Sequence, residues 1–364
     1  MRIDEPWERQ LFDGFLEALR ELPDVRVKLG GTPQAGKSAQ VYDAQVNLNL
    51  GQEAVTLLVE AKKALFPRDV RQLLWKVREV PPDWPLSSER RQTVSCLIAE
   101  TISPGAKDLL RDEGVGYYDS GGSLFLPAGR IYVYVDKPPP KSESKSMRSL
   151  FSGRSAQVLH TVLMRHGGWL GVNEVAEVAQ VSPATASQVL KELEKFDWAE
   201  SRGQGPGKKR QLREPGALLD AWTQQLAVMQ PPIPRRYFVP SVRTGELTEA
   251  LAEACAANNA EYAVTHEAAG QRYAPFLSTV PSVQCLLLAN SAAYKVLDSL
   301  EAHPVNQGAN LMVFEVKTVG EMLFRELLAG IWLASPVQVY LDLMRGEGRG
   351  KDLAQHLRRQ RIGY

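Results

Sequence analysis

Two proline-rich stretches divide the chain and limit what it can fold into. The first covers residues 136–149, DKPPPKSESKSMRS, and the second covers residues 231–236, PPIPRR. Consecutive prolines cannot continue a helix, and the small polar and charged residues around them bury little apolar surface. We therefore interpret both stretches as linkers. They predict three domains, at residues 1–137, 150–230 and 237–364, each with a length typical of a domain or slightly below it.

The charge of the chain is unevenly distributed along these segments. Residues 1–140 and residues 214–364 each have a net charge of −2, whereas residues 141–213 hold 12 Lys and Arg against 7 Asp and Glu, a net charge of +5. A polyanionic partner such as nucleic acid is therefore expected first at the middle segment.

Cysteine usage and hydropathy exclude several classes of protein. Cys96, Cys255 and Cys285 lie far apart and outside any CxxC spacing, which argues against a disulfide framework and against a zinc site. The apolar runs are shorter than the roughly 20 residues that span a bilayer. The first ten residues, MRIDEPWERQ, hold no apolar signal segment. We expect a cytoplasmic protein with no membrane partner.

A match to the phosphate-binding pattern GxxxxGK[ST] occurs at residues 31–38, GTPQAGKS. Such a loop holds phosphates with the N-terminus of the helix that directly follows it. The next residues here, AQVYDAQVNLNLG, alternate between polar and apolar with the period of a strand. We therefore interpret the segment as a hairpin loop and not as an ATP or GTP site.

The pattern of the first segment predicts a mixed α/β domain. Apolar residues at spacings of three and four predict a helix over residues 7–22. The further elements expected are strands near 25–29, 45–50, 54–59, 94–99, 123–126 and 131–135, and helices near 68–77 and 105–113.

Three polar residues of this segment form a candidate site. Asp43 lies on one expected strand, and Glu60 and Lys62 close the next one. Because side chains two residues apart on a strand point the same way, Glu60 and Lys62 share a face. Asp43 joins them if the two strands pair. Two carboxylates suit Mg²⁺, and a lysine can orient or deprotonate a water beside a phosphate. The simpler interpretation is a surface ion pair at a strand end. The same E-x-K tripeptide also occurs at Glu315–Lys317.

The order of these elements resembles the PD-(D/E)xK restriction-endonuclease-like superfamily over about residues 5–135. The matching features are Asp43, the triplet Glu60–Lys62, Glu8 on the helix before the strands and Gln72 on the helix after them. The resemblance implies a nuclease-like fold in which Asp43 and Glu60 bind Mg²⁺ and Glu8, Lys62 and Gln72 complete the catalytic set.

The chain departs from the name-giving pattern of that superfamily, because Tyr42 and not proline precedes Asp43. A fold also does not imply the reaction that it often hosts. DNA cleavage therefore stays an alternative and not the leading function.

The middle segment predicts a winged helix-turn-helix. Apolar spacing predicts helices over residues 155–165, 172–179 and 184–196. Ser182 is a good N-cap for the last of these, and Pro183 suits its first position. The following residues, DWAESRGQGPGKKRQLRE, are typical of two strands joined by a Gly/Pro-rich tip, which is a wing.

The winged helix predicts DNA-contacting side chains by position. Recognition helices place their first turns against base edges. Basic wing residues pair with phosphates or enter the minor groove. Phosphate pairing makes the affinity for DNA steeply salt-dependent. The alternative is a winged helix used for protein contacts, with a solvated basic face. The predicted DNA-binding residues are Arg154, Ser182, Thr185, Ser187, Gln188, Lys191, Arg202, Lys208, Lys209 and Arg210.

The last segment predicts an α/β domain without evident chemistry. A helix over residues 245–258 alternates with apolar strands near residues 283–289 and 311–314. The sequence shows no nucleophile elbow, no glycine-rich fingerprint and no metal-ligand spacing in this segment.

Parts of the chain are similar to AbiEi-family antitoxins of type IV toxin–antitoxin systems. Residues 308–316, GANLMVFEV, and 334–359, ASPVQVYLDLMRGEGRGKDLAQHLRR, look like their C-terminal domain. Residues 106–126, AKDLLRDEGVGYYDSGGSLFL, resemble the region before the winged helix of longer members. The resemblance implies a regulator that binds operator DNA and often represses its own operon. It also implies a C-terminal domain that supports antitoxicity against a nucleotidyltransferase-like toxin, without direct contact.

Three functions remain open at this point. The leading hypothesis is a repressor of the antitoxin type that needs no cofactor to bind DNA and acts as a homodimer on an inverted repeat. The main alternative is a Mg²⁺-dependent endonuclease targeted by the winged helix. The third is a non-catalytic scaffold in a plasmid or phage-defence complex. The expected fold class is α/β plus α+β, multidomain, with a restriction-endonuclease-like N-terminal domain, a central winged helix-turn-helix and a C-terminal α/β domain.

Overall fold

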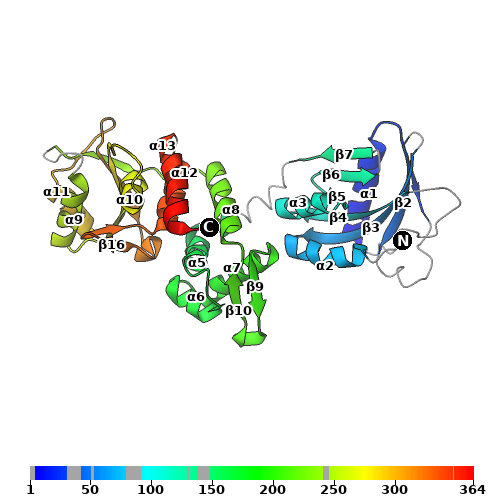
Figure 1. Cartoon of the computed structure of the whole chain (residues 1–364), viewed down its shortest axis with the longest axis horizontal. Coiled ribbons are helices and arrows are strands. Elements are labelled where there is room, and N and C mark those ends of the chain that lie inside the picture. Colours follow the sequence, from blue (N-terminus) through cyan, green and yellow to red (C-terminus); the bar gives the residue numbers. More distant parts are fainter. Residues whose placement is uncertain are drawn as a thin grey trace. The chain divides into compact units, whose positions relative to one another are not determined.

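The computed structural model describes residues 5–30, 42–50, 53–78, 92–128, 131–137, 148–240, 246–346 and 348–364. These residues form a mixed α/β multidomain chain, which confirms the predicted class at that level. They group into two compact units, built mainly from residues 1–146 and from residues 147–364, and many of their elements are labelled in Figure 1. The phosphate-loop pattern at residues 31–38 and residues 138–147 of the first linker lie outside the described residues.

The first unit contains a seven-stranded sheet in which the strands follow one another in sequence order (Figure 1). Strands β1 to β3 are antiparallel, β3 to β5 are parallel, and β5 to β7 are again antiparallel. The elements are α1 (Pro6–Arg20), β1 (Val25–Leu29), β2 (Ala44–Leu50), β3 (Glu53–Leu65), α2 (Pro67–Arg78), β4 (Gln92–Ile102), α3 (Pro104–Asp112), β5 (Gly116–Asp119), β6 (Leu124–Ala128) and β7 (Ile131–Val135).

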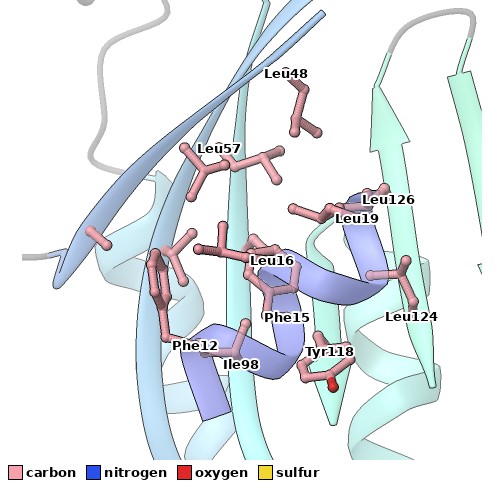
Figure 2. Close-up of a cluster of buried hydrophobic side chains, with 14 of the residues drawn as sticks. Phe12, Phe15, Leu16, Leu19, Leu48, Leu57, Ile98, Tyr118, Leu124 and Leu126 are labelled. Atoms are coloured by element: carbon pink, nitrogen blue, oxygen red, sulfur yellow. The ribbon is translucent and has the colours of Figure 1, made fainter. Parts of the chain in front are cut away.

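Two hydrophobic cores lie on the two faces of this sheet. Figure 2 shows the first, in which Phe12 and Phe15 of α1 pack against strand residues such as Ile98. The second core joins α2 and α3 to the other face through residues such as Leu110 and Leu97. Because successive side chains of a strand point to opposite faces, Ile98 and Leu97 enter different cores. The unit is therefore a three-layer helix–sheet–helix sandwich.

Strand β3 is longer than its apolar pattern predicts. The strand was expected to close with Glu60–Lys62, but it continues to Leu65, with Glu60 opposite Leu97 and Leu65 opposite Ile102 of β4. Pairing with the neighbouring strand extends β3, because cross-strand contacts stabilise a strand beyond its own hydrophobic run. The expectation that Glu60 and Lys62 close a strand is therefore wrong.

A buried ion pair lies at the end of β5. Lys107 Nζ of α3 is 2.7 Å from Asp119 Oδ2 and donates a hydrogen bond of 2.8 Å to Ser123 Oγ. The Ser123 backbone N–H donates to Asp119 Oδ1 at 3.0 Å, and the Lys137 N–H donates to Ser123 Oγ at 3.1 Å. This network ties α3 to the turn between β5 and β6 and to the chain that follows β7.

The second unit begins with helices around a small sheet. One strand, β8, lies between α5 and α6, and the hairpin β9–β10 follows α7; the antiparallel sheet has the order β8-β10-β9. The predicted helices of this segment are found within two residues of their expected ends. The elements are α5 (Gly153–Met164), β8 (Leu170–Gly171), α6 (Val172–Val178), α7 (Pro183–Lys195), β9 (Ala199–Arg202), a 3-10 turn (Gly205–Gly207), β10 (Lys209–Leu212) and α8 (Pro215–Val228).

The rest of the second unit contains a seven-stranded mixed sheet of order β14-β11-β15-β13-β12-β17-β16. The pairs β13–β15 and β12–β17 are parallel, and the other pairs are antiparallel. The elements are β11 (Arg235–Phe238), α9 (Leu247–Ala257), β12 (Tyr262–Thr265), α10 (His266–Tyr273), β13 (Val283–Leu288), α11 (Ser291–Ser299), β14 (His303–Pro304), β15 (Leu311–Val316), a 3-10 turn (Val319–Met322), β16 (Glu326–Leu328), β17 (Ile331–Leu333), α12 (Pro336–Arg345), α13 (Arg349–Leu357) and a π-turn (Arg358–Ile362).

The second proline-rich stretch is a shorter connection than expected. Strand β11 already starts at Arg235, and Arg235 and Arg236 pair with Val313 and Met312 of β15. The prolines thus end before the strand, and the last two residues of the predicted linker belong to the large sheet.

Side chains from both sides of that stretch pack against each other. Helix α12 contacts both α5 and α8. His160 Nε2 of α5 lies 2.5 Å from Ser335 Oγ, which caps α12, and Arg358 Nη1 donates to Asp220 Oδ1 of α8 at 2.5 Å. Residues before and after the prolines therefore share one compact unit.

Candidate nucleic-acid interface and acidic cluster

Asp43 is held beside β3 by two backbone contacts. It precedes the first residue of β2, and its N–H donates to the Val59 carbonyl at 2.9 Å. Its carboxylate Oδ2 accepts a hydrogen bond of 2.8 Å from the Ala61 N–H. The antiparallel pairing of β2 with β3 therefore brings Asp43 next to the Glu60–Lys62 triplet.

Glu60 and Lys62 lie side by side on one face of β3, as their spacing predicts. Lys62 Nζ is 2.7 Å from Glu60 Oε1. The Glu60 side chain is only 7% exposed, whereas that of Lys62 is 41% exposed. The pair thus has a buried carboxylate and an ammonium that water reaches.

The charges of this cluster act on one another. Burial raises the pKa of Asp43 above its ordinary value, the Ala61 hydrogen bond opposes the rise, and nearby Glu60 adds to it. Lys62 lowers that pKa, and Glu8 of α1 raises it further. Three of the other four predicted residues of the site therefore lie close enough to influence the Asp43 carboxyl group.

The fifth predicted residue, Gln72, lies on the exposed surface of α2. In the described part of the chain, no hydrogen bond joins it to Asp43, Glu60 or Lys62. The structure does not bring Gln72 into the cluster through any direct contact.

Tyr42 is a neighbour of the cluster that sequence reasoning did not assign. Its hydroxyl is hydrogen-bonded to Ser95 Oγ at 3.0 Å. Burial raises the pKa of Tyr42, the Ser95 hydrogen bond lowers it, and Glu60 raises it again. The adjacency of Tyr42 to Asp43 was the available signal, but only the fold places its ring near Glu60.

The donor set of this cluster consists of carboxylate oxygens from Asp43 and Glu60. Hard oxygen ligands are the kind that Mg²⁺ accepts, so the chemistry of these two residues fits the ion. Among the described residues, no group of three or more His, Cys, Asp or Glu side chains is arranged to hold a metal.

Helix α7 begins with the cap that the sequence predicts. The Thr185 N–H donates to Ser182 Oγ at 3.2 Å, and the two hydroxyl groups are 3.0 Å apart. Ser182 and Thr185 are thus engaged with each other, and Ser187 is half-buried. Gln188 and Lys191 are the predicted residues of α7 whose side chains are exposed beyond the cap.

The β9–β10 hairpin exposes some of its predicted basic residues and buries one. Arg202 lies directly opposite Lys209, and both are exposed, while Lys208 is half-buried. Arg210 is 5% exposed, and its guanidinium donates to the Lys208 carbonyl at 3.4 Å. Because neighbouring residues of a strand face opposite sides, Lys209 points outward and Arg210 points inward. The assignment of Arg210 as a surface DNA contact is therefore corrected.

Arg154 and Trp169 complete the surface features of this part of the unit. Arg154 lies in the first turn of α5 and is exposed. The guanidinium of Arg202 lies 4.2 Å from the ring centroid of Trp169, which precedes β8. Sequence reasoning missed Trp169, because it lies 33 residues from Arg202 and no local pattern connects them.

No protein-family model, curated protein or solved structure matches this chain. Within the described ranges, no helix is both long and apolar enough to traverse a bilayer. The two sites are therefore interpreted from their own residues.

Proposed function

We propose that this protein is a transcriptional regulator that binds double-stranded DNA through α7 and the β9–β10 hairpin. The observation that carries the proposal is the set of exposed polar and basic side chains there, Gln188 and Lys191 on the helix and Arg202 and Lys209 on the hairpin. Glutamine pairs with base edges, and lysine and arginine bind phosphates or guanine. The net charge of +5 over residues 141–213 favours the same partner.

The order of elements supports this proposal. A helix, a short strand, two helices joined by a turn and a hairpin, with the three strands in one antiparallel sheet, is the order of elements expected of a winged helix. In such proteins the second helix of the pair enters the major groove. We assign α7 as that recognition helix and the β9–β10 hairpin as the wing.

The proposed regulator is a repressor of the AbiEi antitoxin kind. It acts in the cytoplasm as a homodimer on an inverted repeat in its own promoter, because a two-fold symmetric protein matches a two-fold symmetric operator. The same resemblance leads us to propose a nucleotidyltransferase-like toxin encoded nearby. DNA binding itself requires no cofactor in this proposal.

Incubation of the purified protein with DNA from its own promoter tests the proposal. Retention on a native gel should be sequence-specific, should fall steeply with salt, and should leave the DNA intact with Mg²⁺ or Mn²⁺ present. Absence of retention even at low salt would refute DNA binding and favour the alternative of a scaffold that contacts only proteins.

A matched pair of lysine variants sharpens this test. Lys191→Ala removes an exposed charge from α7 and should weaken promoter binding roughly tenfold, in line with the loss of one direct contact. Lys295→Ala removes an exposed charge from α11 and should leave binding unchanged. Equal effects of the two variants would show that α7 does not lie against DNA.

A second candidate function is Mg²⁺-dependent DNA cleavage by the first unit. The observation that favours it is the convergence of Asp43, Glu60 and Lys62, with Glu8 near enough to raise the pKa of Asp43. The order helix, three antiparallel strands, helix and parallel strand is also the order that the resemblance to the restriction-endonuclease-like superfamily implies. In this proposal Asp43 and Glu60 would hold the ion, which would supply an activated water, and Lys62 would orient a water beside a phosphate.

The same gel separates the two functions. Cleavage that needs Mg²⁺ or Mn²⁺ and disappears in Glu60→Ala would make the protein a nuclease. Glu315→Ala is the matched control, because Glu315 belongs to the other E-x-K tripeptide and pairs with Arg235 at 3.0 Å on the surface of β15. Intact DNA in both metals would limit the cluster to a structural role.

A further inference from the structure

The small sheet of the second unit presents one outward face on which Arg202 and Trp169 meet. Arg202 lies opposite Lys209, and Lys209 lies opposite Gly171 of β8, so these three residues share a face. Trp169 is two residues before Gly171 and therefore belongs to that face. The other face holds buried residues, Leu170, Ala199, Arg210 and Leu212.

The guanidinium of Arg202 lies over the indole of Trp169. Its central carbon is 4.2 Å from the ring centroid. The contact spans the small sheet, because Arg202 lies on one edge strand, β9, and Trp169 directly precedes the other edge strand, β8. A Cβ at Gly171 would meet no atom within 4 Å, so this position of β8 is open. The long arginine side chain extends across the central strand to the indole.

This contact orients Arg202 without neutralising it. Arginine over an indole is attracted by the ring electrons and keeps its N–H donors at the rim of the guanidinium. In the described part of the chain, no carboxylate lies within ion-pair distance of Arg202, whereas nearby Arg213 is 3.9 Å from Glu200. An exposed, oriented and uncompensated guanidinium is suited to a phosphate, and it loses less conformational freedom on binding than a mobile one.

We propose that Trp169 is a positioning residue that holds Arg202 ready for a DNA phosphate. This inference rests on the proposed DNA-binding function. It adds that Trp169 raises the affinity for the DNA backbone without contributing to base recognition, because phosphate contacts carry no sequence information.

Binding is measured with two fluorescent duplexes, one carrying the promoter sequence and one of scrambled sequence. The scrambled duplex reports affinity for the DNA backbone, and the difference between the two duplexes reports base recognition. Arg202→Gln should weaken binding to both duplexes by the same factor and should reduce the slope of log K against log salt by about 0.9. Trp169→Leu should weaken binding to both by about twofold to fivefold, the range expected for an exposed cation–π contact. Trp169→Phe should retain most of the affinity, because its ring can still hold the guanidinium.

A double-variant cycle distinguishes positioning from a general structural effect. In the Arg202→Gln background, Trp169→Leu should cause no further loss, since no guanidinium remains to be held. A fold defect would weaken binding equally in both backgrounds and would overturn the inference. Arg272→Gln is the charge-matched control, because Arg272 pairs with Glu249 in the region of the large sheet, and it should leave the salt slope unchanged.

The outcomes separate this inference from the function on which it rests. If the wild-type protein binds neither duplex at low salt, both the DNA-binding proposal and the role of Trp169 are overturned. If it binds and Trp169→Leu binds equally well, or loses affinity only for the promoter duplex, the DNA-binding proposal survives and the role of Trp169 is refuted.

Discussion

Replacing His160 by glutamine should flatten the pH dependence of the stability of the second unit. His160 is 7% exposed on α5, and burial lowers its pKa from an ordinary value of 6.5 to about 4. Ser335 Oγ accepts the Gln338 N–H at 3.1 Å, so its own proton is available to His160 Nε2, 2.5 Å away. Protonation of Nε2 would remove that acceptor and place a charge in a buried site.

The size and sign of the effect follow from the two pKa values. Between about pH 4 and 6.5 the unfolded chain binds a proton at this position and the folded chain does not, so the free energy of unfolding falls as the pH falls. At about 1.36 kcal/mol per pH unit, the interval from 6.5 to about 4 corresponds to about 3 kcal/mol. The stabilisation is fully present above the unfolded pKa and is lost on acidification toward pH 4.

Hydrogen exchange of the α5 peptide, followed by mass spectrometry, measures this free energy where it arises. Glutamine does not titrate and its carbonyl can still accept from Ser335. The difference between wild type and His160→Gln should therefore change by about 3 kcal/mol from pH 7 to pH 4. His166→Gln is the control, because His166 is exposed, and its profile should follow the wild type. Parallel profiles for His160→Gln and wild type would refute the argument.

Three further substitutions test separate parts of the fold. Ser182→Ala removes the acceptor of the Thr185 N–H and should lower the local stability of α7 by about 1 kcal/mol. Unchanged hydrogen exchange of the α7 peptide would contradict this prediction. Asp119→Asn leaves the Lys107 ammonium with only the more exposed Asp136 carboxylate, 3.5 Å away, and should cost about 3 kcal/mol in denaturant unfolding; a cost below about 1 kcal/mol would mean that the pair is not buried in solution. Phe15→Ala removes a ring with no exposed surface and should cost about 3–5 kcal/mol in the same assay, whereas a neutral result would place α1 outside the core.

Local signals in the sequence were sufficient for the helices of the first unit, for α5, α6, α7 and α9, and for some contacts in the candidate sites, but not for α8 or α10 to α13. Ser182 and Pro183 predicted the start of α7, because a hydroxyl cap and a proline at the first position act within one turn. The two-residue spacing of Glu60 and Lys62 predicted their contact, because side chains on a strand alternate.

Strand ends and site neighbours were harder to predict, because they depend on residues distant in the sequence. Strand β3 extends to Leu65 only because β4 pairs with it. Short strand β5 was missed for the same reason, since its four residues form a strand between β4 and β6. The burial of Arg210 required the register of the small sheet, which no local pattern specifies.

By itself, the sequence determined a mixed α/β multidomain chain, its basic middle segment and the positions of the helices that carry the proposed DNA contacts. Capping, hydrophobic periodicity and charge act over a few residues and can be read directly. The tertiary structure decided that Asp43 lies beside Glu60, that Trp169 holds Arg202, and that His160 is buried against Ser335. Each of these contacts joins residues at least 17 positions apart, so it exists only after strand pairing and helix packing have brought them together.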